Sequence, residues 1–320
     1  MPIIGIDLGC LGTKVATVGR GGVTIVRNDL ADRVTPTLVS YTDNERLIGD
    51  AAFTSLKSNA RSTIRNIKHQ LGMTDTAEDR DVVELERRFA LAEPVVAENR
   101  VIAFSVGREE PVTAVAALVP FLKKVKAMSE SYIGAPVSDC VVAVPTWYSD
   151  VHKTAVLDAC SLAGIGCHKV MQHSTATALD YGLFRRSMFV EGQRHVVVFT
   201  DIGYAQATAT VVDYTPKKFT VLATLEDSAL GGRSIDQVVV QHLLAQFKSK
   251  TGLDPSRNAK AMLKLEEAAE KAKKILSANK DAGVHLECFF EDEDLDVPLN
   301  REILQDLLGP ARSVSPEYRT

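Results

Sequence analysis

Gly5-Ile6-Asp7-Leu8-Gly9 near the start of the chain, and Phe199-Thr200-Asp201-Ile202-Gly203 in its second half, decide the fold. Each stretch ends an apolar, strand-like run with Asp, an aliphatic residue and Gly. Each is followed by a second β-rich run, a polar turn and a third strand, with helical stretches between the two copies. Alone, such a pentad can be an ordinary turn at a strand end. Two copies with matching downstream patterns predict a duplicated lobe of β-hairpin and helices, facing itself across a cleft.

An Asp at a strand end followed by Gly suits phosphate chemistry. The glycine lets backbone N–H groups approach phosphate oxygens closely. The Asp repels phosphate, so its natural role is to hold the hydration shell of Mg²⁺ or to orient a water molecule. Two such turns would clamp the β- and γ-phosphates of a nucleotide from both sides. Other phosphate motifs fail, because Gly12-Thr13-Lys14 is only a fragment of a P-loop and no Rossmann G-x-G-x-x-G is present.

Composition and charge exclude several classes of partner. The 320 residues are 45% apolar, which suffices for one large two-lobed unit or two domains. Because 37 basic residues face 41 acidic ones and the net charge is −4, neither nucleic acid nor an anionic membrane is expected as a partner. No apolar run is long enough to span a membrane. A strand-like run from Ile3 leaves no room for a signal peptide, so we expect a cytoplasmic protein.

The five cysteines are odd in number and contain no Cys-x-x-Cys pair. Buried thiols in a reducing compartment explain them most simply. Cys160, Cys167, His168 and His173 lie close together in sequence, but their spacing matches no common zinc pattern. No metal site is therefore predicted from these four residues.

The pattern of apolar residues predicts an alternation of strands and helices. A helix is predicted from Ser234, whose Ser-x-x-Gln sequence forms a capping box, and a longer one opens at Asp254-Pro255 and runs to about Ser277. The other expected elements are strands at 137–144, 170–171, 195–199, 207–213, 219–224 and 284–290, and helices at 112–128, up to 162, at 175–184 and from 301.

The longer helix carries Glu270, Lys273, Lys274 and Ser277 at positions i, i+3, i+4 and i+7, so these four side chains share one face. Such a patch could clamp an adenine and its ribose. A solvated face supported by Glu–Lys pairs is the simpler interpretation, and the helix alone favours it.

Six segments in order along the chain resemble the heat-shock 70 chaperone superfamily. They are residues 4–9 (IGIDLG), 60–72 (ARSTIRNIKHQLG), 139–182 (DCVVAVPTWYSDVHKTAVLDACSLAGIGCHKVMQHSTATALDYG), 198–203 (VFTDIG), 230–236 (LGGRSID) and 266–279 (EEAAEKAKKILSAN). The resemblance implies an α/β, actin-like ATPase fold (ribonuclease-H-like) with two duplicated lobes around a nucleotide cleft. Residues 1–186 would form lobe I with a subdomain inserted at about 36–111. Residues 187–320 would form lobe II, with a subdomain at about 228–306 and an incomplete C-terminal end.

Carried over residue by residue, the resemblance implies a site for ATP or ADP with Mg²⁺. Asp7 and Asp201 would hold the hydrated metal, and Lys68 matches the family's catalytic lysine. The resemblance also implies contacts with the nucleotide itself. Gly9 and Gly203 would line the phosphates, Gly231 and Gly232 would border the ribose, Glu270, Lys273, Lys274 and Ser277 would clamp the adenosine, and Pro145 and Lys153 match a relay that carries nucleotide state outward.

Departures from the family pattern point to weak catalysis. Cys10 and Leu11 replace two threonines of the first loop, and His173 replaces an acidic residue. The second loop lacks its usual Gly-Gly-Thr run, where Tyr204, Ala205, Gln206 and Thr208 stand instead. Such a loop is similar to that of the heat-shock 110 branch. We expect His173 to contact phosphate or water, the alternative being a surface-turn histidine.

These features predict ATP binding with very slow hydrolysis, because each lost acid–base or water-orienting group is typically worth about 10²–10⁴ in rate. The resemblance implies a nucleotide-gated co-chaperone that promotes nucleotide exchange on heat-shock 70 and contacts unfolded clients through regions absent here. An active chaperone ATPase is the alternative, and a sugar or acetate kinase on the same fold is less well supported.

Overall fold

The computed structural model describes residues 2–19 and 21–309 of the chain. Backbone contacts divide it into two compact units, Met1–Ala229 and Leu230–Thr320, each of which is considered by itself. The expected incomplete C-terminal end of lobe II falls mostly outside the described residues. Within the described part, no helix combines the length and apolar character that a membrane span requires.

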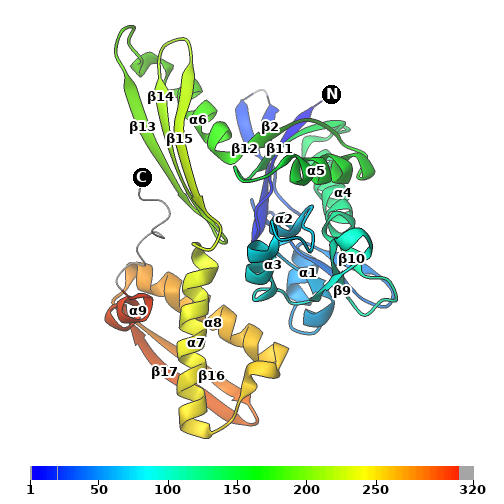
Figure 1. The fold of residues 1–320 in the computed structure, drawn as a ribbon, viewed down its shortest axis with the longest axis vertical. Helices are drawn as coiled ribbons and strands as arrows, with labels where there is room; N and C mark the ends of the chain where they lie inside the picture. The colour runs from blue at the N-terminus through cyan, green and yellow to red at the C-terminus, as the bar shows by residue number, and fades with distance from the viewer. Residues whose placement is uncertain (1, 20, 310–320) are drawn as a thin grey trace. The chain divides into compact units, whose positions relative to one another are not determined.

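The central sheet of the first unit combines parallel and antiparallel strands (Figure 1). Its order is β12 (Gly166–Gln172), β11 (Asp139–Val144), β1 (Ile3–Asp7), β2 (Gly12–Gly19) and β3 (Gly22–Ile25), with the short β4 (Thr35–Pro36) also pairing with β2. β1 runs parallel to β11 and β11 parallel to β12, whereas β1, β2 and β3 form an antiparallel meander. β1 therefore lies in the middle of the sheet, and Asp7 is its last residue.

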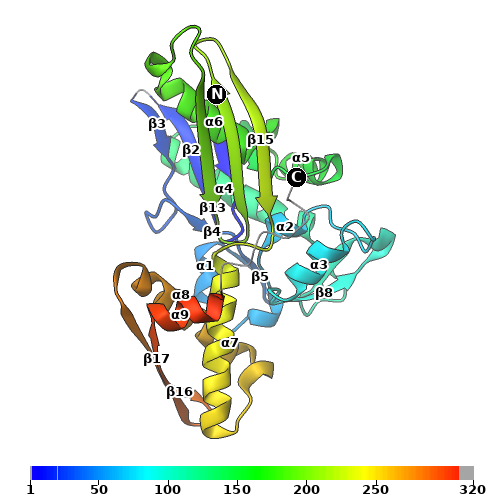
Figure 2. The ribbon, with the colours of Figure 1, turned by 60° about the vertical axis from the view of Figure 1, so that its left-hand side comes forward.

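A second sheet in the same unit repeats the meander. It consists of β13 (His195–Ile202), β14 (Ala207–Tyr214) and β15 (Phe219–Asp227), and α6 (His173–Phe184) lies along one of its faces (Figures 1 and 2). Asp7 pairs with Lys14 across β1 and β2, and Asp201 pairs with Thr208 across β13 and β14. Because each Asp pairs with the residue seven positions later, the two hairpins share one register. The duplication predicted from the sequence is present in the backbone.

The core of the first unit lies between the central sheet and α4 (Ala114–Ile133) and α5 (Asp150–Leu162). Fully buried side chains such as Ile4, Ile6, Phe121 and Val142 fill it. Smaller elements complete the unit. They are β5 (Val39–Tyr41), β6 (Arg46–Ile48) and β7 (Thr63–Ile64) in one sheet, β8 (Glu93–Val96), β9 (Ile102–Ser105) and β10 (Val112–Thr113) in another, the helices α1 (Asp50–Thr54), α2 (Ile67–Gln70) and α3 (Arg80–Arg87), and the 3₁₀ turns η1 (Ala60–Ser62), η2 (Glu98–Arg100) and η3 (Arg186–Met188).

The second unit packs helices against a β-hairpin. It contains α7 (Gly232–Thr251), η4 (Pro255–Arg257), α8 (Ala259–Ala278), β16 (Asp281–Phe290), β17 (Glu293–Asn300) and α9 (Arg301–Leu308). Its own apolar core joins α7 and α8 to both strands, with Leu243, Leu265 and Leu295 almost completely buried. This core is consistent with a separate compact unit.

Four local predictions are wrong at their boundaries. α7 begins at Gly232 with Gly231 as its N-cap, so Ser234 lies inside the helix and forms no capping box. Pro255 opens only the 3₁₀ turn η4, and α8 begins at Ala259 behind Asn258, whose side chain accepts a hydrogen bond from the Ala261 amide. β12 spans seven residues and α6 begins at His173, because pairing with β11 extends the strand beyond its short apolar run.

Candidate functional site

The two Asp-x-Gly corners have the same backbone form. At the first corner, a Cβ on Gly9 would lie 2.3 Å from the carbonyl oxygen of Gly12, so only glycine fits. At the second, the amide of Gly203 donates to the carbonyl of Gln206 over 2.8 Å, and a Cβ would meet that oxygen at 3.4 Å. Both corners therefore fold back on the residue three positions later, which turns the loop backbone away from the strand.

His173 lies at the first corner rather than on the surface. Its Nδ1 is 3.5 Å from Oδ1 of Asp7, and its side chain is only 21% exposed, against 50% for Asp7. Burial, reinforced by the positive charge of Lys68 and opposed by Asp201, lowers the pKa of His173 to about 4. The imidazole is thus neutral at pH 7, and the alternative of a surface-turn histidine is wrong.

The second ring nitrogen of His173 faces away from any partner. Nε2 is buried and makes no hydrogen bond to the described residues. A buried polar atom without a partner is costly, and such atoms commonly mark a missing water or ligand. If Nδ1 carries the proton toward Asp7, Nε2 is an acceptor. A water molecule satisfies this atom, whereas a phosphate oxygen, itself an acceptor, does so only with the other tautomer.

Lys68 belongs to the same group of side chains. It lies in the short helix α2, is buried, and its backbone carbonyl accepts a hydrogen bond from the Tyr148 hydroxyl. Its charge acts on His173, and it also opposes the rise that burial imposes on the pKa of Glu226. Asp7, Lys68, His173 and Asp201 are therefore brought into one electrostatic environment within the first unit.

A buried polar chain joins α2 and α3 to the loop of the second corner, and most of its residues carry no signal in the sequence. His69 contacts Oε1 of Glu86 through Nδ1 over 2.9 Å and Oε1 of Gln206 through Nε2 over 3.0 Å. Gln206 in turn donates from Nε2 to Glu226 over 2.6 Å. Since both partners of His69 present acceptor oxygens, the imidazole donates through both nitrogens and is doubly protonated.

Charges around His69 agree with this assignment. Although burial opposes protonation, the negative charges of Cys10 and Glu86 raise the pKa of His69 to about 9. Burial would raise the pKa of the Cys10 thiol, but His69 and Lys68 hold it below its usual value. Cys10, which replaces a family threonine, therefore lies beside a buried imidazolium in the first loop.

In the second unit, the adenosine-patch residues already have protein partners. Nζ of Lys273 lies 2.6 Å from Oδ1 of Asp236 and donates to the Gly232 carbonyl over 3.2 Å. Lys274 pairs with Glu270 over 2.7 Å, and the Ser277 hydroxyl donates back to the Lys273 carbonyl. The Lys273 contact draws α8 to the first turn of α7, next to Gly231. Glycine turn and patch are thus neighbours within this unit.

The first unit fits a hydrated, doubly charged metal ion and a polyphosphate. The half-exposed carboxylate of Asp7 has the oxygen ligands that Mg²⁺ and its bound water prefer. The Gly9 corner has no room for a side chain, which suits a close backbone approach by an anion. The unpartnered Nε2 of His173 adds a place for water beside both.

The duplicated meander, the paired corners and the interposed helices define an α/β domain of the actin-like ATPase fold. The family described as "Hsp70 protein" matches residues 3–313 of the chain. The chain therefore belongs to the Hsp70 family, whose ATPase domain binds nucleotide.

Curated relatives agree along nearly the whole chain. Heat shock 70 kDa protein 4 of Rattus norvegicus is 34% identical over 326 residues, covering 98% of this chain and 39% of the relative. Heat shock protein 88 of Dictyostelium discoideum is 31% identical, covering 95% of this chain and 39% of the relative. Heat shock 70 kDa protein 4L of Homo sapiens is 32% identical over 312 residues, with 96% and 37% covered. Similarity to the heat-shock 110 branch is confirmed, and the chain spans about two fifths of these relatives.

Proposed function

We propose that this chain binds ATP with Mg²⁺ at the Asp7 and Asp201 corners, hydrolyses it very slowly, and uses the bound nucleotide to control docking on a heat-shock 70 partner. Gly9 and Gly203 would line the phosphates. Mg²⁺, when bound, neutralises phosphate charge, and Asp7 and Asp201 would hold its water shell. Gly231, Gly232 and the patch of Glu270, Lys273, Lys274 and Ser277 would bind the adenosine.

The neutral His173 beside Asp7 is the observation that carries slow hydrolysis. A carboxylate at this position could accept a proton from an attacking water or bind metal-bound water as an anion. An imidazole with a pKa of about 4 is neutral at pH 7, so it can orient water but supplies no negative charge to hold metal-bound water or to stabilise a proton taken from the attacking water. Phosphate binding would instead draw on the backbone donors at the two corners. We therefore expect affinity for ATP to outlast efficient turnover.

One observation favours the alternative of an active chaperone ATPase. Lys68, the candidate catalytic lysine, is buried close enough to His173 for its charge to act on that imidazole. Single-turnover hydrolysis of ATP separates the two functions. A rate matching conventional heat-shock 70 proteins would overturn slow hydrolysis, and we expect a rate lower by at least about 100-fold.

His173→Glu tests the reason for that low rate. We expect the carboxylate to raise the single-turnover rate at least tenfold while ATP affinity stays similar, and His173→Gln, which is neutral like the native imidazole, serves as the matched control. An unchanged rate in His173→Glu would show that His173 is not the limiting departure.

Exchange activity is measured separately, as release of labelled ADP from a heat-shock 70 protein on addition of this chain. We expect faster release when the chain is loaded with ATP and Mg²⁺. Equal release with the nucleotide-free chain would contradict nucleotide gating, and no acceleration in either form would contradict the exchange role.

A further inference from the structure

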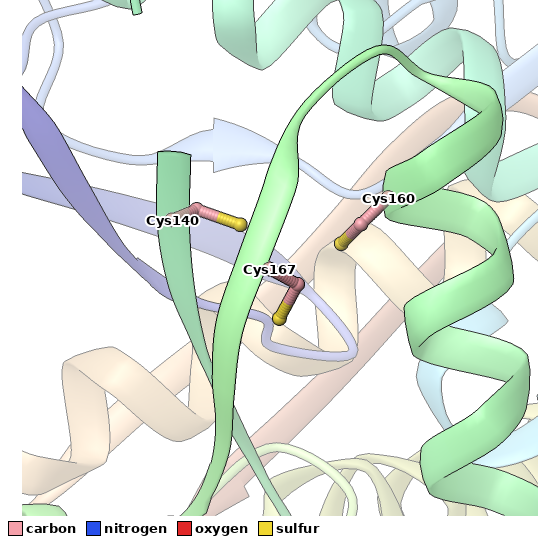
Figure 3. A group of neighbouring side chains, drawn as sticks. All are labelled: Cys140, Cys160 and Cys167. Atoms are coloured by element: carbon pink, nitrogen blue, oxygen red, sulfur yellow. The ribbon is translucent and has the colours of Figure 1, made fainter. Parts of the chain in front are cut away.

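Three cysteines from three different elements converge inside the first unit. Cys140 comes from β11, Cys167 from β12 and Cys160 from α5 (Figure 3). Their sulfur atoms all lie within 4.8 Å of one another, and all three thiols are free. No role at the nucleotide site uses any of them.

Strand pairing and a bulge explain why the sulfurs converge. Cys140 and Cys167 are partners in the parallel β11–β12 ladder, and paired residues point to the same face of a sheet. The register shifts directly after this pair, so His168 is an extra residue on β12. Such bulges re-aim side chains. His168 contacts Asp139, with Nε2 3.3 Å from Oδ1, and α5 brings Cys160 over the thiol-bearing face.

The cysteine cluster is shielded from solvent at Cys140 and Cys160 and partly accessible to solvent at Cys167. Cys140 and Cys160 are completely buried, whereas Cys167 is only partly buried. β12 is the last strand of the sheet in the described chain, so the cluster is closest to solvent along this edge. The group contains only sulfur ligand atoms. Sulfur-only sites select soft cations such as zinc or copper(I) over magnesium or calcium.

We propose that Cys140, Cys160 and Cys167 bind one soft, thiol-preferring cation of the zinc and copper(I) class. Each ligating thiol releases its proton to solvent, and neither the ion nor sulfur changes oxidation state. Two thiolates on one tetrahedral zinc ion lie about 3.8 Å apart, given Zn–S bonds of about 2.3 Å. The sulfurs are close enough to reach that spacing by small side-chain rotations. Zinc would take its fourth ligand from the Cys167 side, whereas copper(I) is satisfied by three sulfurs.

The site would tie together the three elements behind the first corner. β11 lies beside β1, whose last residue Asp7 pairs with Ala143, and β11 leads directly to Pro145. A bound ion would therefore stabilise β11, β12 and α5 without touching the nucleotide residues. This role is independent of the proposed ATP binding.

The test uses the reduced full chain under anaerobic conditions, titrated separately with Zn²⁺ and with Cu⁺ delivered from a competing chelator. Native mass spectrometry and thiolate-to-metal absorption should show one ion per chain, together with a higher Tm. The ion that competes more strongly against its chelator identifies the preferred metal. Cys160→Ala should lower affinity at least about 100-fold. Cys288→Ala, at an exposed cysteine, should leave it unchanged.

A cooperative unfolding transition of each metal-free variant shows that the variant folds. If Cys160→Ala does not fold, Cys167→Ala on the edge strand takes its place. The proposal would be overturned if neither Zn²⁺ nor Cu⁺ formed a one-to-one complex with the chain. A complex that survives loss of Cys160 or Cys167 would also overturn it, as would a disulfide among the three cysteines in place of metal uptake.

Discussion

The two Asp-x-Gly corners share one backbone but differ in what surrounds them. At the first corner, Asp7 contacts a neutral, partly buried His173. At the second, Gln206 accepts from the imidazolium of His69 and donates to Glu226. The two corners share one hairpin register, whereas the side chains around each corner differ. The comparison separates what the fold requires from what the chemistry of this chain requires.

The largest expected difference concerns pH and belongs to the first corner. The pKa of His173 is lowered from 6.5 to about 4 in the folded chain, so the unfolded state binds more protons between these values. The free energy of unfolding should therefore fall as pH drops from 6.5 to 4, by up to about 3 kcal/mol. Denaturant unfolding of wild type and His173→Gln over this range measures it. Equal pH slopes for both proteins would contradict the assignment.

Alanine at the two corner glycines gives a matched pair. Gly9→Ala places a Cβ 2.3 Å from a backbone oxygen and should cost about 2–3 kcal/mol of unfolding free energy. Gly203→Ala meets its nearest oxygen at 3.4 Å and should cost less than about 1 kcal/mol. Thermal or chemical unfolding measures both. Equal losses of unfolding free energy would show that the two glycines are equally tightly packed, which contradicts the difference between the two Cβ distances.

Gln206→Leu interrupts the polar chain at the loop of the second corner. It leaves Nε2 of His69 and a carboxylate oxygen of Glu226 without their partner, which should lower the unfolding free energy by about 1–3 kcal/mol. Thr208→Val, in the same hairpin, is the control and should cost clearly less. If Gln206→Leu lowers the unfolding free energy no more than Thr208→Val does, the polar chain contributes little to stability.

Asp7→Asn and Asp201→Asn sharpen the comparison at the level of ligand binding. If both carboxylates hold metal-bound water, each variant should bind ATP about tenfold more weakly in the presence of Mg²⁺, or about 1.4 kcal/mol. Calorimetric titration with Mg²⁺ and with EDTA measures this, and EDTA should remove the difference from wild type. Loss at only one corner would assign the metal to that corner.

The sequence predicts the corners and the lobes because backbone requirements leave local traces. An Asp-x-Gly at a strand end is visible in five residues, and its repetition is visible without coordinates. The polar chain leaves no such trace, because its four residues come from α3 (Glu86), α2 (His69), the loop after β13 (Gln206) and β15 (Glu226). The burial of His173 was equally hidden, since it depends on α6 starting one residue after β12 ends.

The cysteines show the same limit from another side. The spacing of Cys160, Cys167 and the nearby histidines in the sequence matches no common metal-binding motif. The third sulfur comes from Cys140 on β11, which only strand pairing brings into reach. The helix starts at Gly232 and Ala259 were also missed, because α7 is preceded by Gly231 without a side-chain cap and α8 is capped by Asn258 rather than by Asp254.

The hydrogen bond between His69 and Gln206 has a mechanical consequence. It joins α2 to the loop that follows β13. The loop therefore cannot move away from α2 without exposing a charged imidazole to water. Water would then replace glutamine as the acceptor, and alkaline conditions that neutralise the ring would weaken the tether. The strength of the His69–Gln206 contact thus depends on whether the imidazole of His69 is doubly protonated.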